Sequence, residues 1–304
     1  METIEIGKIN VHDRTFCVSY PLEDDLLFAS VAQFGILMPL GLLRREPPVI
    51  VTGFKRLEAA KRLGIEEIPC VFLDVSERQA LLTAIMDNLG RPLNTIEKAR
   101  GAEKMLMGGF STEEVYGVMK LLGLPPGERA LGTAVAAACA EEVLKAFVVR
   151  HRLPLFVVEQ LLWFDPDERA LVFRLVDPLN ASVASLREIL QLLMLLKVKR
   201  GGIALPELGG AEDMDALRRR VKGQTHPVLS ALEGRLRAIL AASALPPHIK
   251  VQVDPAFEKE SIDIVIRARS NGEVEEALGK VEGLFRQGLF RDIFELTHGA
   301  PHRN

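Results

Sequence analysis

The stretch VIVTGFKRLEAAKRLG, residues 49–64, is the most informative part of the chain. Its first apolar residues predict a buried strand that ends at Thr52 and Gly53, and a helix is predicted to begin directly afterwards. Lys55 and Arg56 fall in the first turn of that helix, where cations are normally unfavourable. Unpaired N–H groups at a helix N-terminus bind anions, and glycine allows close backbone approach. The pattern therefore predicts a phosphate-binding turn, although solvated charges beside an ordinary turn would look the same.

A small α/β domain is predicted around this turn. Residues 1–91 alternate short apolar runs, bounded by turn residues, with amphipathic runs. The last helix follows Ser76, which has Gln79 in the capping-box position. We assign this domain to residues 1–93, with strands expected at 4–9, 37–43, 47–53 and 68–75 and helices at 22–35, 54–64 and 76–88.

The remainder of the chain is predicted to be mainly helical up to residue 200. Three helix starts there have capping boxes, in which a polar N-cap is followed three residues later by glutamate. The cap pairs are Asn94 with Glu97, Ser111 with Glu114, and Asp165 with Glu168.

A C-terminal unit is predicted beyond the Gly/Pro-rich run KRGGIALPELGG at 199–210, which is typical of a linker. Two runs of period-two alternation, at 248–254 and 261–268, indicate paired strands between helices. We therefore predict an α+β protein whose α/β domain is followed by a helical domain at 94–200 and an α-β-β-α unit at 201–304.

Composition narrows the class of protein. The 304 residues are 48% hydrophobic and 26% charged, and the net charge of −3 gives no overall attraction to nucleic acid. Three cysteines without disulfide or zinc spacing indicate a reducing cytoplasm. The start of the chain lacks an apolar signal core, and the longest apolar run, 189–198, is too short to span a bilayer. We expect Cys70 to fill core and Cys17 to be accessible.

Three motifs resemble the nucleotide-binding domain of the ParB/sulfiredoxin superfamily. "GFKR" at 53–56 stands where ParB-like domains have a Gly-Glu-Arg-Arg box. "DNLGRPLNTIEKA" at 87–99 is similar to their Glu-Asn-Leu-Gln-Arg box and its continuation, and "SVAQFGILMPL" at 30–40 is similar to their lead-in. The order holds from residue 4 to about residue 100. Sulfiredoxins have their catalytic cysteine where this chain has Phe54, so the ParB-like branch is favoured.

The resemblance implies a nucleotide site for CTP or another nucleoside triphosphate with Mg²⁺. Asn88 would lie near the metal or phosphate. From the residues alone, a polar helix end is the preferred interpretation of Asp87 and Asn88. The residues expected to bind the nucleotide are Thr52, Gly53, Lys55, Arg56, Asp87, Asn88 and Arg91.

Several residues depart from the ParB-like pattern at positions that would affect nucleotide hydrolysis. Phe54 replaces a glutamate and can neither accept a proton nor hold a metal. Lys55 replaces an arginine, which clamps a phosphate better than lysine, and Gly90 replaces a glutamine. The run 15–17 stands where the family has Gln-Pro-Arg, although Arg14 could compensate. We expect nucleotide binding with slow or absent hydrolysis.

DNA contact through residues 111–147 is expected to be mainly electrostatic. In partition proteins this region is a helix-turn-helix, but here its second helix is rich in alanine and offers Arg129 as its base-reading side chain. The basic cluster with Lys145, Arg150 and Arg152 suits phosphates, although the residues alone favour solvated side chains at a helix end. We expect Trp163 to anchor the core.

Three hypotheses follow for the function. The first is a ParB-like, nucleotide-binding, DNA-associated switch that forms homodimers through its C-terminal unit, by analogy with partition proteins. The second is an adaptor that keeps this fold without the ligand. The third is a small-molecule kinase, which needs a base beside the transferred phosphate. We rank the switch first and the kinase last.

Overall fold

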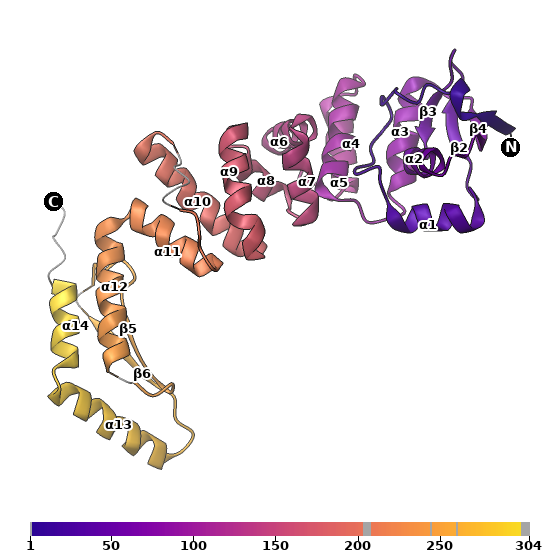
Figure 1. Ribbon diagram of the computed structural model, residues 1–304. Coiled ribbons are helices and arrows are strands. Elements are labelled where there is room, and N and C mark those ends of the chain that lie inside the picture. The colour runs from indigo at the N-terminus through magenta and orange to yellow at the C-terminus, as the bar shows by residue number, and fades with distance from the viewer. Residues whose placement is uncertain (1, 203–207, 244, 260, 299–304) are drawn as a thin grey trace. The chain divides into compact units, whose positions relative to one another are not determined.

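The computed structural model describes residues 2–202, 208–243, 245–259 and 261–298, and it shows an α+β protein. Its chain divides into two compact units, Met1–Leu190 and Gln191–Asn304 (Figure 1). Each unit is described by itself below. The finer division at residues 93 and 200 stays a prediction.

A four-stranded mixed sheet forms the start of the first unit. Its order is β1-β4-β2-β3, in which β2 runs parallel to β4 and the other neighbours are antiparallel. Leu42, Ile50 and Ile68 are completely buried, so these strands carry the core. The strands are β1 (Glu2–Glu5), β2 (Leu40–Leu43), β3 (Val49–Thr52) and β4 (Glu67–Leu73).

Two predicted strands are shorter than expected. The run 4–9 is a strand only up to Glu5, because it then turns into the 3₁₀ helix η1 (Ile6–Lys8). The run 37–43 becomes a strand only at residue 40. The carbonyl groups of Met38 and Pro39 accept hydrogen bonds from the Arg56 side chain instead of a neighbouring strand.

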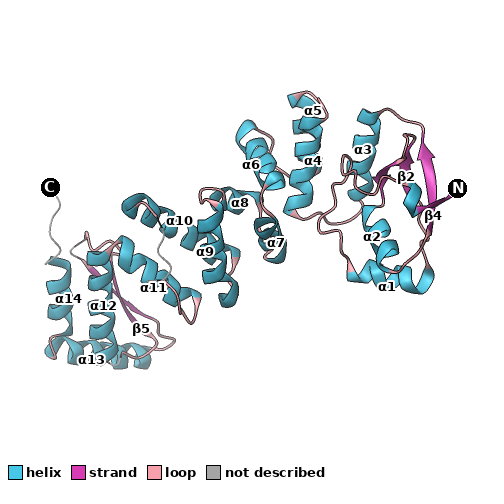
Figure 2. Ribbon diagram, turned by 45° about the horizontal axis from the view of Figure 1, so that its top comes forward, coloured by secondary structure: helices cyan, strands magenta, loops and turns pink. Residues whose placement is uncertain are grey.

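Three helices accompany the sheet: α1 (Asp25–Phe34), α2 (Phe54–Arg62) and α3 (Glu77–Asn88). Helix α1 packs against α2, and α3 packs against β3 (Figure 2). The capping box of Ser76 and Gln79 at the start of α3 is confirmed. Because β3 leads directly into α2, the edge of the sheet fixes the position of that helix's N-terminus.

The helical part of the first unit begins at residue 95 and is connected by short turns. Its three predicted capping boxes, at the starts of α4, α5 and α9, are all present. Trp163 is 38% exposed, so its prediction as a core anchor is wrong; Phe164, 1% exposed, fills that role. The elements are α4 (Thr95–Met107), α5 (Thr112–Leu121), α6 (Glu128–Cys139), α7 (Glu142–Arg150), α8 (Leu155–Leu161), α9 (Pro166–Val176), η2 (Asp177–Leu179) and α10 (Val183–Arg200).

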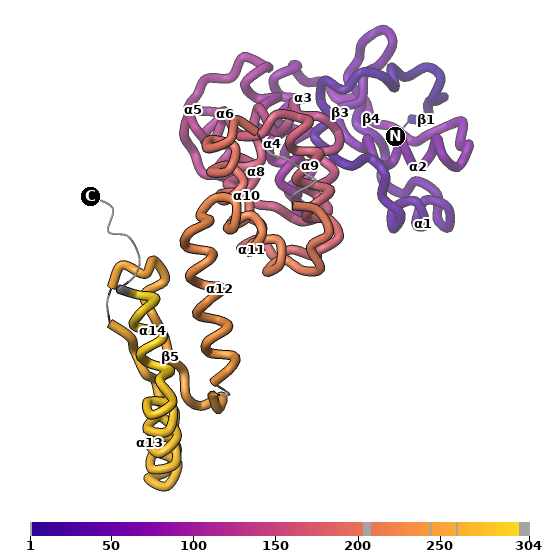
Figure 3. The backbone as a smooth tube through the Cα atoms, turned by 60° about the vertical axis from the view of Figure 1, so that its left-hand side comes forward, coloured from indigo at the N-terminus to yellow at the C-terminus, as the bar shows by residue number. Residues whose placement is uncertain are grey.

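The second unit contains the predicted α-β-β-α order with an additional helix at each end. A cluster around Leu284, Phe290 and Ile293 forms its core. Figure 3 traces the backbone of this unit. Residues 203–207 of the predicted linker lie outside the described residues, and α10 extends through Arg200. The elements are α11 (Met214–Thr225), α12 (Pro227–Ala242), β5 (Ile249–Val253), β6 (Ile262–Ile266), α13 (Asn271–Arg286) and α14 (Leu289–His298).

Candidate nucleotide pocket

All seven residues predicted to bind a nucleotide line one pocket of about 400 Å³ in the first unit. They come from two segments far apart in the sequence: the phosphate turn, residues 52–56 at the junction of β3 and α2, and the second box, residues 87–91 at the end of α3. Their assembly depends on α3 packing against β3. Of the carboxylates at 23–25, which the kinase hypothesis would need near the phosphate, Asp24 lines the pocket. Sequence analysis missed three further residues that line the pocket or hold its walls: Ser19, Met38 and Glu97.

Gly53 gives the phosphate turn its shape. Its φ of +95° lies in the left-handed region, which glycine adopts at little cost. Helix α2 begins at the next residue without a side-chain cap, so no capping side chain satisfies its first N–H groups, which belong to residues that line the pocket. A Cβ atom at Gly53 would lie 3.2 Å from the Arg56 guanidinium carbon and 3.1 Å from Leu40 Cγ. Both backbone and packing therefore require glycine here.

Gly53→Ala is expected to lower the free energy of unfolding by about 1–3 kcal/mol, the cost of a strained residue, with additional loss from the contact with Arg56. Gly64→Ala is the matched control, because Gly64 has a φ of +68° but no neighbouring atom within 4 Å of an added Cβ. Thermal unfolding of both variants separates strain from contact. Equal losses in the two variants would contradict a packing role for Gly53.

Lys55 is held at the pocket by an ion pair. Its Nζ atom donates to Asp24 Oδ2 at 3.1 Å, and Asp24 also caps α1 by accepting from the Leu27 N–H. Burial raises the pKa of Asp24, but the hydrogen bonds from Leu27 and Lys55 outweigh it and hold the pKa below its ordinary value. The carboxylate therefore stays charged and keeps the ammonium group beside the turn.

Arg56 supports the pocket wall more than it offers a free charge. Its Nη1 atom donates to Met38 O at 2.8 Å and Pro39 O at 2.6 Å, and its Nη2 lies 3.9 Å from Asp87 Oδ2. Burial lowers the pKa of Arg56, and the charge of Asp87 acts in the opposite direction. A phosphate in the pocket would have to share this guanidinium with two backbone carbonyls.

The second box is organised by Arg91. Its Nη2 atom donates to Asn88 Oδ1 at 2.7 Å and to Glu97 Oε1 at 2.6 Å, while its Nη1 donates to Glu97 Oε2 at 2.9 Å. Ser19 Oγ donates to the same Asn88 oxygen at 3.3 Å. Glu97 is 1% exposed and is the N3 residue of the α4 capping box. The capping-box motif signals its local role, but not its pairing with Arg91.

Asn88 does not fit the predicted role of a Mg²⁺ ligand in this arrangement. Its side-chain oxygen already accepts from Arg91 and Ser19, and its amide nitrogen donates to Ala84 O at 2.8 Å. Mg²⁺ prefers carboxylate oxygens, water and substrate phosphates. Among the described residues, no group of three or more acidic, histidine or cysteine side chains could hold a metal ion.

Phe54 and Cys17 are core residues. Phe54 is 4% exposed, and the Arg14 guanidinium carbon lies 5.6 Å from the centre of its ring. Cys17 is 3% exposed, so the prediction that it is accessible is wrong; burial also raises the pKa of its thiol. Cys70 is buried as predicted. None of the three supplies a reactive group at the pocket.

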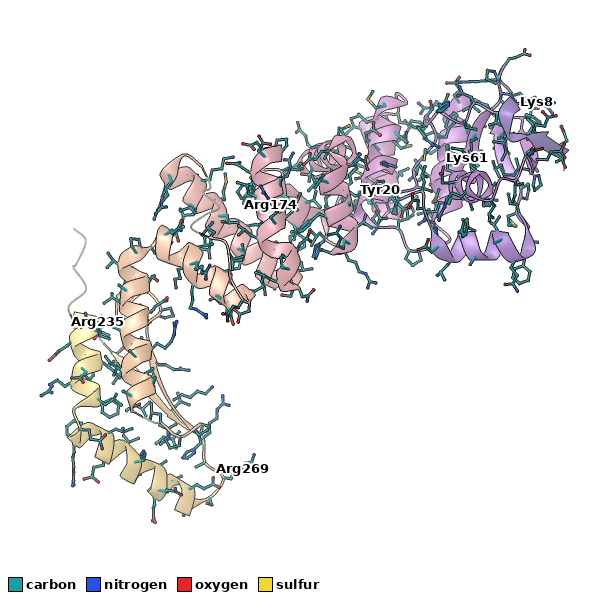
Figure 4. All side chains as sticks on the ribbon, in the orientation of Figure 1. Lys8, Tyr20, Lys61, Arg174, Arg235 and Arg269 are labelled. Atoms are coloured by element: carbon teal, nitrogen blue, oxygen red, sulfur yellow. The ribbon has the colours of Figure 1, made fainter. Side chains whose placement is uncertain are left out.

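Tyr20 connects the pocket wall with the helical part of the unit. Its N–H donates to Glu97 Oε1 at 3.2 Å, and its carbonyl accepts from Asn94 Nδ2 at 2.6 Å. The Arg100 guanidinium carbon lies 4.7 Å and Lys145 Nζ 5.9 Å from the ring centre. Figure 4 labels Tyr20 among the side chains of this unit. Burial and the neighbouring Glu142 raise the pKa of Tyr20 to about 12.

The predicted DNA-contacting cluster is only partly available. Lys145 is 7% exposed and pairs with Glu142 at 2.6 Å, so its prediction as a phosphate contact is wrong. Arg150 pairs with Asp177 at 3.0 Å. Lys145 and its partner Glu142 both lie on α7, whereas the partner of Arg150, Asp177, comes from η2.

Arg129 and Arg152 instead meet at a second concave surface of about 700 Å³, together with Lys98. The surface includes the turn before α6, residues 123–127, and the start of α6 itself. Arg129 is highly exposed and pairs with Glu159. Sequence analysis missed Lys98 because it comes from α4.

Fold and pocket together define a protein with an α/β domain, whose pocket is lined by Lys55, Arg56 and Arg91, followed by a helical region. The family model of the ParB N-terminal domain matches residues 4–89. The chain is 33% identical over 246 residues to the "Probable plasmid-partitioning protein ParB" of Thermus thermophilus, covering 76% of this chain and 80% of that protein. This chain therefore belongs to the ParB family of partitioning proteins.

Other similar proteins are also named as partitioning proteins. The chromosome-partitioning protein Spo0J of the same organism is 35% identical over 111 residues, which cover 32% of this chain and 41% of Spo0J. A solved structure of C-terminally truncated ParB from Caulobacter crescentus, complexed with CTP-γ-S, is 19% identical with a TM-score of 0.24, covering 56% of this chain and 95% of that one. Within the described residues, the helices are too short or too polar to cross a membrane.

Proposed function

We propose that this protein is a nucleotide-binding, DNA-associated partition factor that acts as a homodimer in the cytoplasm. The observation that carries the proposal is the convergence of the phosphate turn and the second box on one pocket at the uncapped start of α2. Free N–H groups and cations at a helix N-terminus suit phosphate groups. The CTP analogue in the Caulobacter crescentus protein names CTP as the first nucleotide to test.

The charge of the pocket suits a polyanion that can displace internal partners. Lys55, Arg56 and Arg91 line it, opposed by Asp24 and Asp87. Each cation already has an acceptor within the protein. A triphosphate would replace these acceptors with several charged oxygens at once. An adaptor that binds no nucleotide would retain the same internal ion pairs. Direct binding measurements must therefore distinguish the nucleotide-binding switch from the adaptor.

The test is isothermal calorimetry of the full chain with CTP, ATP, GTP and UTP, each with and without Mg²⁺ and duplex DNA. Saturable binding of one nucleotide supports the switch. An absence of binding at millimolar concentrations of all four would contradict the nucleotide proposal and favour the adaptor.

Hydrolysis is expected to be slow or absent. Phe54 occupies the position of the family's glutamate and is buried, so it supplies no carboxylate to a reacting water. Phosphate release with bound nucleotide and DNA should stay at background. Robust release that Lys55→Ala abolishes would instead support an enzymatic function.

DNA binding is expected to be mainly electrostatic, through the concave surface with Lys98, Arg129 and Arg152. Affinity should fall with salt with a log–log slope of about −0.9 per phosphate neutralised. Replacing Arg129 and Arg152 with alanine should reduce the magnitude of that slope by roughly 2. Fluorescence anisotropy with random and selected duplexes measures this. Enrichment of one motif by about 10³-fold would show sequence-specific recognition instead.

A further inference from the structure

Glu97 lies at the centre of a buried hydrogen-bond cluster behind the pocket. Its carboxylate accepts from both Nη atoms of Arg91, from the Tyr20 N–H at 3.2 Å and from the Asn94 N–H at 3.1 Å. Each carboxylate oxygen thus has one donor from Arg91 and one from the backbone. With 1% of its surface exposed, this negative charge depends on these four donors rather than on water.

Arg91 belongs both to this cluster and to the pocket. Its guanidinium lines the pocket, yet its two Nη atoms are directed to Glu97 and Asn88. Both protons of Nη2 are donated to Asn88 and Glu97, so a phosphate that binds Arg91 through this atom must weaken one of these two bonds. When the pair with Glu97 opens, the remaining donors to Glu97 are the backbone N–H groups of Tyr20 and Asn94, which lie at the junction with the helical part of the unit.

We propose that Glu97 gates the nucleotide pocket: it holds Arg91 in an internal pair that an incoming phosphate must open, and it transmits the occupancy of the pocket to Tyr20 and to the start of α4. This inference rests on the proposed nucleotide binding and assigns a regulatory role to a residue outside the pocket lining. Glu97 is a positioning residue, because it acts through Arg91.

The gate lowers the apparent affinity of the pocket. A ligand that binds only the opened pair has its affinity reduced by the fraction of molecules in which the pair is open. A neutral side chain of the same shape at position 97 binds Arg91 less strongly. It also removes a negative charge near the bound anion. Both effects favour tighter binding of the nucleotide.

The experiment compares wild type, Glu97→Gln, Arg91→Gln and the double variant by calorimetric titration of the full chain with CTP and with inorganic tripolyphosphate. Glu97→Gln is expected to bind about tenfold more tightly, the scale of one charge-assisted hydrogen bond. Arg91→Gln should bind more weakly, and adding Glu97→Gln to it should give a much smaller gain than in wild type, because only the effect of the removed negative charge is left. A purely structural glutamate would lower the affinity when replaced, whether or not Arg91 is present.

Glu114→Gln is the matched control. Glu114 is also a capping-box glutamate paired with an arginine, Arg78, at 2.7 Å, but it is half exposed and does not line the pocket. Its replacement should leave CTP affinity unchanged. A gain equal to that of Glu97→Gln would show a general charge effect and overturn the gate.

Two further outcomes separate the gate from the proposed function. If wild type binds CTP and folded Glu97→Gln binds no more tightly, the gate alone fails; if neither binds, both proposals fail. If Glu97→Gln does not fold, NMR of the wild type decides. Amide resonances of Tyr20 and Asn94 should shift in proportion to CTP occupancy, and unchanged resonances at saturation would overturn the gate.

Discussion

Glu97→Ala is expected to lower the free energy of unfolding of the first unit by about 1–3 kcal/mol, because Arg91 is one-third exposed and water replaces part of the lost ion pair. The substitution leaves the guanidinium of Arg91 without its carboxylate. It also leaves the buried N–H groups of Tyr20 and Asn94 without an acceptor. Unsatisfied buried donors add their own desolvation cost.

Urea unfolding followed by tryptophan fluorescence measures this loss. Trp163 is the only tryptophan of the sequence and lies in the first unit, so its signal reports that unit without contributions from the second. Glu114→Ala is the control, since Glu114 occupies the same capping position with an exposed carboxylate and should cost far less. A loss below about 1 kcal/mol for Glu97→Ala, the level of an ordinary hydrogen bond, would show that water replaces the carboxylate.

Lys55→Ala is expected to weaken nucleotide binding by about 10- to 100-fold, which corresponds to one hydrogen bond to a charged group. Lys55 lies in the first turn of α2, its Nζ is partly exposed at the pocket, and its present partner is a single carboxylate. Asp24 keeps its bond to the Leu27 N–H in the variant, so α1 retains its cap. The loss should therefore concern the ligand rather than the fold.

Calorimetric titration with the bound nucleotide measures the effect, and Lys61→Ala serves as the control. Lys61 lies on the same helix but in its last turn, where it pairs with Glu58 outside the pocket lining. Unfolding measurements should show both variants to be folded. Equal affinities for Lys55→Ala and wild type would show that the lysine of the phosphate turn does not bind the nucleotide. The residues of the second box would then be the next to test.

The sequence predicted well those features of the fold that depend on residues close together in the chain. The α+β class, the strand-glycine-helix turn at Gly53 and the capping boxes of α3, α4, α5 and α9 are confirmed. Each of these features is set within a few residues by backbone conformation and local hydrogen bonds. Membership of the ParB family was likewise expected from motifs at 53–56 and 87–99, and the comparisons confirm it.

Only the tertiary structure decided how charged side chains are used. The sequence predicted Lys145 to be an exposed cation at a helix end, but its side chain is buried beside Tyr20. The same holds for one apolar position: Phe164, and not Trp163, is the aromatic residue in the core. The sequence indicated that Arg91 belongs to the second box and that Glu97 belongs to the capping box of α4. In the structure the two side chains form an ion pair in which Glu97 is buried. Side-chain exposure and pairing depend on elements that pack from elsewhere in the chain, and the residues themselves carry no local signal of those contacts. The sequence alone thus determined where the strand-glycine-helix turn with Lys55 and Arg56 lies, while packing determined which partners these two cations have.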